Sequence, residues 1–86
     1  MPEVSRFRGI QISIYLNDHN PPHFHVRYQR ERAKVAIIAL DIIQGHLSRP
    51  IRRRVVEWAS LHQHELREAW ERQSRGQEPG RIEPLP

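Results

Sequence analysis

Three of the six histidines in this 86-residue chain lie within seven positions of one another, in the segment NDHNPPHFHVRY (residues 17–28). A pair of prolines forms a rigid turn between His19 and the other two, His23 and His25. Beyond the turn, polar and apolar residues alternate, as they do along a strand, so His23 and His25 share one face while the apolar residues share the other. Two histidines on one face can bind the same metal ion through their ring nitrogens.

The histidine cluster is compatible with three kinds of chemistry. It predicts a site for a divalent metal ion, zinc for example, with His23 and His25 as ligands. His19 or Asp18 supplies the third ligand, and one coordination position stays open. Alternatively, His23 and His25 act as catalytic groups without metal, because unperturbed histidines near pKa 6.5 can exchange protons with an RNA 2′-hydroxyl. The third alternative has no ligand, and the rings then only satisfy the backbone of the turn. The chain has no cysteine, so a metal here takes nitrogen or oxygen ligands.

A basic run, RPIRRR at residues 49–54, is the second candidate site. Its arginines stand where a helix is expected to begin, although the helix dipole favours acidic residues at that end. A bound anion explains this arrangement, because free backbone N–H groups and arginine side chains would converge on one phosphate. The alternative is a solvated surface, partly offset by an Arg53–Glu57 pair. The predicted anion-binding residues are Arg49, Arg52, Arg53 and Arg54.

Hydrophobic periodicity predicts strands in the first half of the chain. Apolar and polar residues alternate at 10–16 and again at 23–28, whereas 33–40 is more continuously apolar and 41–47 is short. Turn-forming residues separate these segments, which is typical of consecutive antiparallel strands.

The period changes to that of a helix from Pro50 onward, and we expect one long helix that ends at about residues 72–75. Ser48 is a suitable N-cap, and Gly76 a suitable stop. His62 falls within the apolar stripe of this helix, so we expect a core or interface histidine there. The stripe consists of Ile51, Val55, Trp58, Ala59, Leu66, Ala69 and Trp70.

The expected architecture is therefore an α+β fold, with a three- to four-stranded antiparallel meander and one long C-terminal helix packed on one face. We expect a single domain at residues 1–75 and an extended Pro-rich tail at 76–86, which lies on the body through Ile82 and Leu85. The N-terminal residues have no apolar run typical of a signal peptide, and no segment is long and apolar enough to span a bilayer, so we expect a cytoplasmic protein without a membrane partner. The net charge of +4 favours an anionic partner, nucleic acid first.

Several motifs together resemble one family of short bacterial proteins, the domain of unknown function 4160. They are the NDHNPPHFHVRY segment, the LDII segment, the helix VVEWASLHQHELREAW and the terminal IEPLP, so the similarity covers essentially the whole chain. One departure is SRPIRRR, where family members read more like LPKRAL. The residues that match the family motifs are Asn17, Asp18, His19, Pro21, Pro22, His23, Phe24, His25, Glu57, Trp58, Leu61, His62, Glu65, Leu66 and Trp70.

The resemblance implies no established activity, but it implies a two-gene module of the toxin–antitoxin kind. Our first expectation is therefore an interaction module with a small protein partner encoded nearby, in contact with nucleic acid. The alternative is a histidine-based nuclease or a metal-dependent hydrolase centred on His19, His23 and His25. A purely structural interaction domain is the third reading, and a homodimer is compatible with all three.

Overall fold

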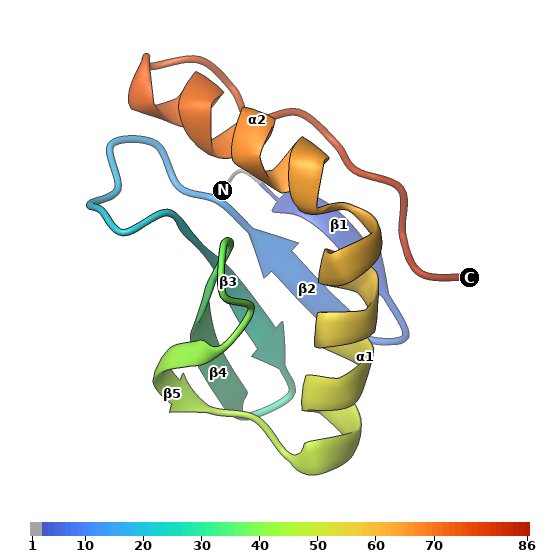
Figure 1. Cartoon of the computed structure of the whole chain (residues 1–86). Coiled ribbons are helices and arrows are strands. Elements are labelled where there is room, and N and C mark those ends of the chain that lie inside the picture. The colour runs from blue at the N-terminus through green and yellow to red at the C-terminus, as the bar shows by residue number, and fades with distance from the viewer. Residues whose placement is uncertain (1–2) are drawn as a thin grey trace.

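The computed structural model describes residues 3–86 as one five-stranded antiparallel sheet followed by two helices (Figure 1). The strand order is β1-β2-β3-β4-β5, so each strand pairs with its neighbour in the sequence. This confirms the α+β class and the antiparallel meander, whereas the predicted numbers of strands and helices were too low. The elements are β1 (Glu3–Phe7), β2 (Ile10–Ser13), β3 (His23–Tyr28), β4 (Glu31–Ala36), β5 (Ile42–His46), α1 (Arg49–Leu61) and α2 (Gln63–Ser74).

Strand β1 escaped prediction because its apolar residues do not alternate. Val4 and Phe7 are three positions apart, yet both are buried in the core. The register between β1 and β2 shifts between Glu3 and Ser5, which is the signature of a β-bulge. The bulge changes which side chains point inward, so a period of two could not reveal this strand.

Two predicted strands end earlier than their apolar residues suggest. Strand β2 ends at Ser13 and β4 ends at Ala36, so Leu16 and Ile38 lie beyond the sheet and are exposed. After β4 the chain turns back at once, with Leu40 N–H donating to the Ala36 carbonyl. The apolar residues in both places predict strand, but the backbone leaves the sheet before it reaches them.

The predicted single helix is two helices that meet at His62, whose backbone (φ −124°, ψ 25°) is not helical. A continuous helix over 49–74 would be roughly 39 Å long at 1.5 Å per residue. The six-residue strands span only about 20 Å, so a straight helix would run past the sheet. The break lets α1 cross one face of the sheet, while α2 covers the end of the sheet near the turn between β2 and β3 (Figure 1).

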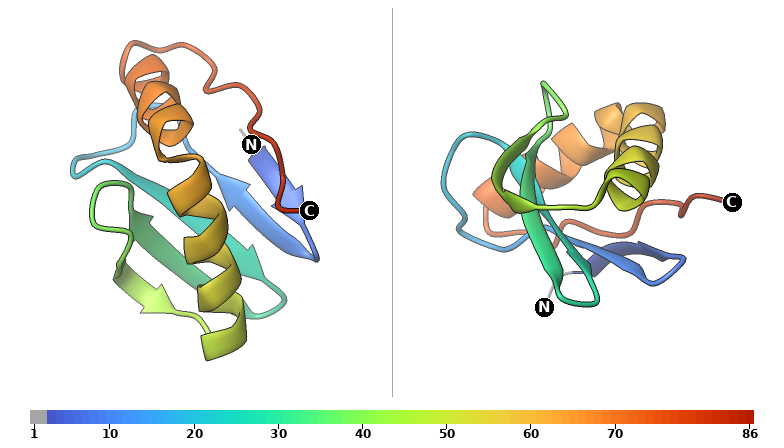
Figure 2. Two further views of the ribbon diagram at one scale, coloured as in Figure 1. Left: turned by 45° about the vertical axis from the view of Figure 1, so that its right-hand side comes forward. Right: turned by 90° about the horizontal axis from the view of Figure 1, so that it is seen from below.

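The core lies between the sheet and α1, with Trp58 at its centre. The Trp58 side chain is fully buried, and its ring lies 5.5 Å from Phe7 and 5.9 Å from Phe24, measured between ring centroids. Ile10, Ile12 and the other inward residues of the strands complete this layer. Both helices lie on the same side of the sheet, and the opposite face carries no helix within the described residues (Figure 2).

The C-terminal segment after α2 forms no helix or strand, but it packs on the body. Ile82 is buried, and its backbone N–H donates to the Val4 carbonyl at 2.7 Å. The indole N–H of Trp58 donates to the Glu83 carbonyl at 2.8 Å, so the tail satisfies the one polar group of the central tryptophan. Leu85 packs against the core as well. Among residues 3–86, the two helices are too short and too polar to cross a membrane.

Candidate metal centre and the adjoining pocket

The turn between β2 and β3 folds Asp18 back over the first residues of β3. Asn17 adopts a left-handed backbone conformation with φ 61°, and the Asn20–Pro21 peptide bond is cis. The backbone N–H of His19 donates to Asp18 Oδ1 at 2.9 Å. This bond fixes one carboxylate oxygen within the turn, and the other oxygen, Oδ2, points toward β3.

Asp18, His23 and His25 form the one group of potential metal ligands that the structure brings together within residues 3–86. His25 Nε2 lies 2.9 Å from Asp18 Oδ2, and His23 Nε2 lies 3.1 Å from the same oxygen. One ligand atom from each of the three side chains lies within 4.8 Å of the other two. Ligand atoms bound tetrahedrally to zinc at about 2.0–2.2 Å are roughly 3.3–3.6 Å apart. Small side-chain movements therefore separate the observed arrangement from a coordinated one.

His23 is the most constrained of the three ligands. Its side chain is buried, with 4% of the residue exposed, and its ring packs on Trp70 of α2 at 5.2 Å between centroids. Nδ1 lies 2.7 Å from the Pro21 carbonyl, so Nδ1 carries the proton that it donates there. In the neutral ring, Nε2 is then left with a lone pair. This atom makes no hydrogen bond within the described part of the chain, although it faces the Asp18 carboxylate.

The protonation of Asp18 and His25 suits metal binding. Burial alone would raise the pKa of Asp18, but hydrogen bonds from His25 and from the His19 backbone hold that pKa below its ordinary value. Burial lowers the pKa of His25, and the partly opposing effect of Asp18 does not reverse this. Near neutral pH the aspartate is therefore charged and the His25 ring is neutral, with its proton on Nε2, which donates to Asp18. Metal binding through Nε2 requires that this proton move to Nδ1.

The structure places the other predicted histidines away from this centre. The side chain of His19 is exposed and lies outside the group of three ligands, so His19 contributes through its backbone N–H. His62 packs on Trp58 at 5.7 Å, and its Nδ1 lies 2.6 Å from Glu65 Oε1. His23 differs from expectation in one respect, because it is covered by α2 instead of lying on an open face. The break at His62 explains this difference, since it carries Trp70 over the end of the sheet.

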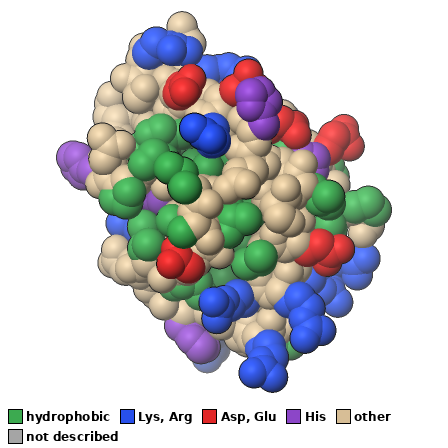
Figure 3. All heavy atoms as spheres, in the orientation of Figure 1, with side chains coloured by type: hydrophobic (Ala, Val, Ile, Leu, Met, Phe, Trp, Pro, Cys, Tyr) green, Lys and Arg blue, Asp and Glu red, His purple; other side chains and the backbone are tan. Residues whose placement is uncertain are grey.

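The basic run at the start of α1 is exposed, and Lys and Arg side chains gather there on the surface (Figure 3). The helix has no acidic residue in its first turn, as the sequence indicated. A carboxylate from elsewhere does reach this terminus, because the backbone N–H of Ser48 donates to Glu31 Oε1 at 2.8 Å. Part of the anion-binding capacity of the terminus is thus used within the chain. Anion binding by Arg49, Arg52, Arg53 and Arg54 stays a prediction.

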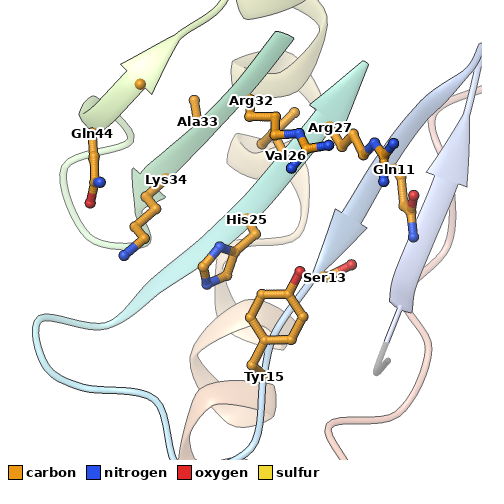
Figure 4. Close-up of a pocket in the computed structure, with 11 residues that line it drawn as sticks. Gln11, Ser13, Tyr15, His25, Val26, Arg27, Arg32, Ala33, Lys34 and Gln44 are labelled. Carbon is orange, nitrogen blue, oxygen red and sulfur yellow. The ribbon is translucent and has the colours of Figure 1, made fainter. Parts of the chain in front are cut away.

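A pocket of about 420 Å³ opens on the sheet face that carries no helix, directly beside His25 (Figure 4). We call it the open-face pocket. The figure shows polar side chains of β2, β3, β4 and β5, among them Gln11, Arg27, Lys34 and Gln44, projecting toward the same side, with the helices behind the sheet. Its lining residues are Gln11, Ser13, Tyr15, His25, Val26, Arg27, Arg32, Ala33, Lys34, Gln44 and Gly45.

The sequence did not predict the open-face pocket. Alternation had placed Arg27 on the same face as His25, but the contribution of β4 depends on strand register. In the structure Lys34 pairs directly with His25, and Arg32 pairs directly with Arg27. The available signal was the polar face of β4, where Arg32 and Lys34 alternate with apolar residues.

Comparison with known proteins gives a family and no assigned activity. No curated protein and no solved structure matches the chain. The model of one family, described as a domain of unknown function (DUF4160), matches residues 9–71. This range contains Asp18, His23, His25 and every residue of the open-face pocket. The chain belongs to the DUF4160 family.

Proposed function

We propose that this protein is a metal-dependent hydrolase whose divalent ion is bound by Asp18, His23 and His25. The observation that carries the proposal is the buried Nε2 of His23, which lies 3.1 Å from a carboxylate oxygen without a hydrogen bond. In the neutral ring this atom carries a lone pair that faces a carboxylate, which is unfavourable, and buried polar atoms without partners are rare in folded proteins. A divalent ion held by His23 and Asp18 would satisfy the ring nitrogen and offset the charge of the carboxylate.

The surroundings of the ligands also support a metal. Histidines that bind metal ions typically donate their other ring N–H to a carbonyl or carboxylate, which fixes the ring and its tautomer. His23 has this arrangement already, through Nδ1 and the Pro21 carbonyl. Asp18 is oriented in the same way by the backbone N–H of His19 and, through its own N–H, by Gln73 Oε1 at 3.3 Å.

The ligand types favour zinc or a neighbouring transition metal over magnesium or calcium. Two imidazoles and one carboxylate suit zinc, cobalt, nickel and ferrous iron, whereas magnesium and calcium prefer oxygen ligands alone. Zinc sites with three protein ligands keep a fourth position for water and are catalytic, whereas structural zinc sites are closed by four ligands. The ligand count therefore points to chemistry rather than to a structural role.

The expected chemistry is hydrolysis. A bound divalent ion would lower the pKa of a coordinated water to about 7 and so supply hydroxide at neutral pH. In the reaction the water oxygen bonds to the electrophilic centre of the substrate, the bond to the leaving group breaks, and the leaving group receives a proton. His25 is part-exposed and lines the open-face pocket, so substrate can approach the centre from that side.

Cobalt titration of protein stripped with a chelator tests the proposal. We expect saturable visible absorption bands at one equivalent, which zinc displaces, and we expect His23→Gln and His25→Gln to lose them. His64→Ala is the matched control, because the side chain of His64 is 85% exposed and lies on α2. His19→Ala decides the third ligand that the sequence left open, and we expect it to bind cobalt like the wild type. Failure of the wild type to bind cobalt, zinc or nickel at millimolar concentration would remove the proposal.

An interaction with a small protein encoded nearby, in a toxin–antitoxin-like pair, is independent of the metal centre and stays a prediction. Co-expression of the two neighbouring genes with a tag on one product measures it directly. A complex that survives metal removal would place the interface away from Asp18, His23 and His25.

A further inference from the structure

The open-face pocket concentrates positive charge without compensating carboxylates. Arg27, Arg32 and Lys34 line it, and no Asp or Glu is among its lining residues. Within residues 3–86, the arginine ion pairs are made by Arg6 and Arg81. The three cations of the pocket therefore face solvent without an ionic partner among the described residues.

The strand register places these cations opposite one another, which lowers the stability of the sheet. Arg27 and Arg32 are direct cross-strand partners on β3 and β4, and His25 and Lys34 form the next pair on the same face. Like charges directly opposite each other destabilise a sheet. Positions that oppose stability in this way are expected where a ligand supplies the missing counter-charge.

The chemistry of the pocket fits phosphate esters. Arginine side chains bind phosphate oxygens through two parallel hydrogen bonds, and lysine adds a point charge. Gln11, Ser13 and Gln44 add neutral hydrogen-bonding groups around these cations. The volume of about 420 Å³ lies in the range of small-molecule sites, so the pocket admits one nucleotide unit at a time.

The position of the pocket connects it to the metal centre. His25 belongs to both, and its ring lies 4.2 Å from the Tyr15 ring at the rim of the pocket. A phosphate held by Lys34 is beside His25, because directly paired residues have Cβ atoms about 4.5–5.5 Å apart. Figure 4 shows the Lys34 and His25 side chains projecting from adjacent strands toward the same space.

From these observations we infer that the open-face pocket binds the phosphodiester backbone of single-stranded nucleic acid and presents it to the metal centre. The pocket lies on an open sheet face, which lets a chain enter and leave, whereas its size excludes a stacked duplex. The second half of this inference rests on the proposed hydrolase. The binding half does not, because Arg27, Arg32 and Lys34 are not metal ligands.

Two charge-matched triple variants test the binding. Arg27→Gln/Arg32→Gln/Lys34→Gln removes the pocket cations, and Arg52→Gln/Arg53→Gln/Arg54→Gln removes three from the start of α1. Fluorescence anisotropy of labelled single-stranded RNA and DNA oligonucleotides is measured from 50 to 200 mM salt, with chelator present. We expect the pocket variant to lose roughly 2 units from the slope of log K against log salt, about 0.7 for each of three contacts with the phosphate of the bound nucleotide unit and those that flank it along the strand.

The slope translates into a measurable change in affinity. A loss of about 2 units means that, between 50 and 200 mM salt, oligonucleotide binding by the wild type weakens roughly 16-fold more than binding by the pocket variant. We expect the α1 variant to keep most of the wild-type affinity. The pocket variant should also melt no lower than the wild type, because it removes two like-charged neighbours from the sheet. Equal binding by wild type and pocket variant overturns the inference, and so does loss of binding in the α1 variant alone.

Two further experiments distinguish a nucleic-acid strand from a free nucleotide as the ligand, and oligonucleotide binding from metal binding. Uridine monophosphate as a competitor is expected to displace the oligonucleotide only at far higher concentration, and displacement at equal concentration would overturn the assignment to a nucleic-acid strand. Cobalt titration of the pocket variant is expected to match the wild type. If wild-type protein binds oligonucleotide but no metal, the hydrolase proposal fails while the binding inference stands. If the wild-type protein binds metal but no oligonucleotide at 50 mM salt, the binding inference fails while the hydrolase proposal stands.

Discussion

Asp18→Asn separates a metal ligand from a structural ion pair, because the two roles predict opposite effects on the metal-free protein. Asparagine keeps Oδ1 as the acceptor for the His19 N–H, a bond of 2.9 Å in the structure. It replaces Oδ2, the oxygen near both His25 Nε2 and His23 Nε2, with an NH₂ group. One N–H can donate to His23 Nε2, and the other can donate to His25 Nε2 once the His25 ring moves its proton to Nδ1, so the His25 contact is reversed rather than lost. The variant therefore satisfies the buried nitrogen that has no hydrogen bond within residues 3–86.

The two roles of Asp18 predict different changes in the Tm of the metal-free protein. If Asp18 stabilises the fold by pairing with a charged His23, its loss costs about 1.5–3 kcal/mol, typical of hydrogen bonds to charged groups. At about 4–8 °C per kcal/mol for a domain of this size, Tm falls by roughly 6–24 °C. If Asp18 is a metal ligand, the new neutral hydrogen bond contributes about 0.5–1.5 kcal/mol. The metal-free Tm is then unchanged or raised by up to about 12 °C, and this is the result we expect.

Zinc supplies the second measurement. At a free concentration 100 times Kd, binding stabilises the wild type by about 2.7 kcal/mol, or roughly 11–22 °C in Tm. We expect this shift to vanish in Asp18→Asn at the same zinc concentration. Both melting curves are recorded by circular dichroism at pH 7.5, with chelator and then with zinc.

Glu65→Gln is the matched control, because Glu65 accepts from His62 Nδ1 at 2.6 Å, outside the metal centre. It should leave the zinc shift of the wild type intact. A metal-free Asp18→Asn protein that melts more than 6 °C below the wild type, together with a wild type that zinc does not stabilise, would refute the metal centre.

Three further variants test the fold around the site. Trp58→Ala should lower the free energy of unfolding by about 3–5 kcal/mol, since the ring is fully buried and bonded to the tail; an unchanged urea midpoint would contradict this packing. Gly45→Ala should disrupt the β4–β5 pairing, because a Cβ there would lie 2.2 Å from the Arg32 carbonyl and φ is +89°; unchanged hydrogen exchange in β5 would show that the strand adapts. Glu3→Gln should weaken the fall in the free energy of unfolding below about pH 4.5. Hydrogen bonds from Arg6 and Arg81 lower the pKa of Glu3, so the stabilisation by ionised Glu3 is present above about pH 4.5 and is lost as the pH falls. If the free energy of unfolding falls below about pH 4.5 as steeply as in the wild type, these bonds do not form in solution.

Local patterns predicted the parts of the fold that local chemistry controls. Alternation identified β3 and the inward residues Ile10, Ile12 and Ile14, which are all fully buried. The helical stripe identified Trp58 and Leu66 correctly even though the helix is broken between them. The stripe still predicts buried residues after the break, because α1 and α2 each keep an apolar face toward the core.

Non-local geometry decided the rest. The bulge in β1 and the break at His62 depend on how the chain meets the sheet, which no period reveals. The sequence left Asp18 and His19 open as the third ligand, and the turn conformation alone turns the carboxylate inward and leaves His19 exposed. The open-face pocket could not be predicted either, because it depends on the register that sets Lys34 opposite His25.

The break at His62 also explains why a site on a turn can be well ordered. After the break, α2 lies against the turn through two contacts: the Trp70 ring packs on His23, and Gln73 Oε1 accepts the backbone N–H of Asp18. Gln73 is fully buried, so this contact is held by the core rather than by solvent. A straight helix would have left the turn uncovered. The break that the sequence did not predict therefore supplies the rigid support that a three-ligand centre requires.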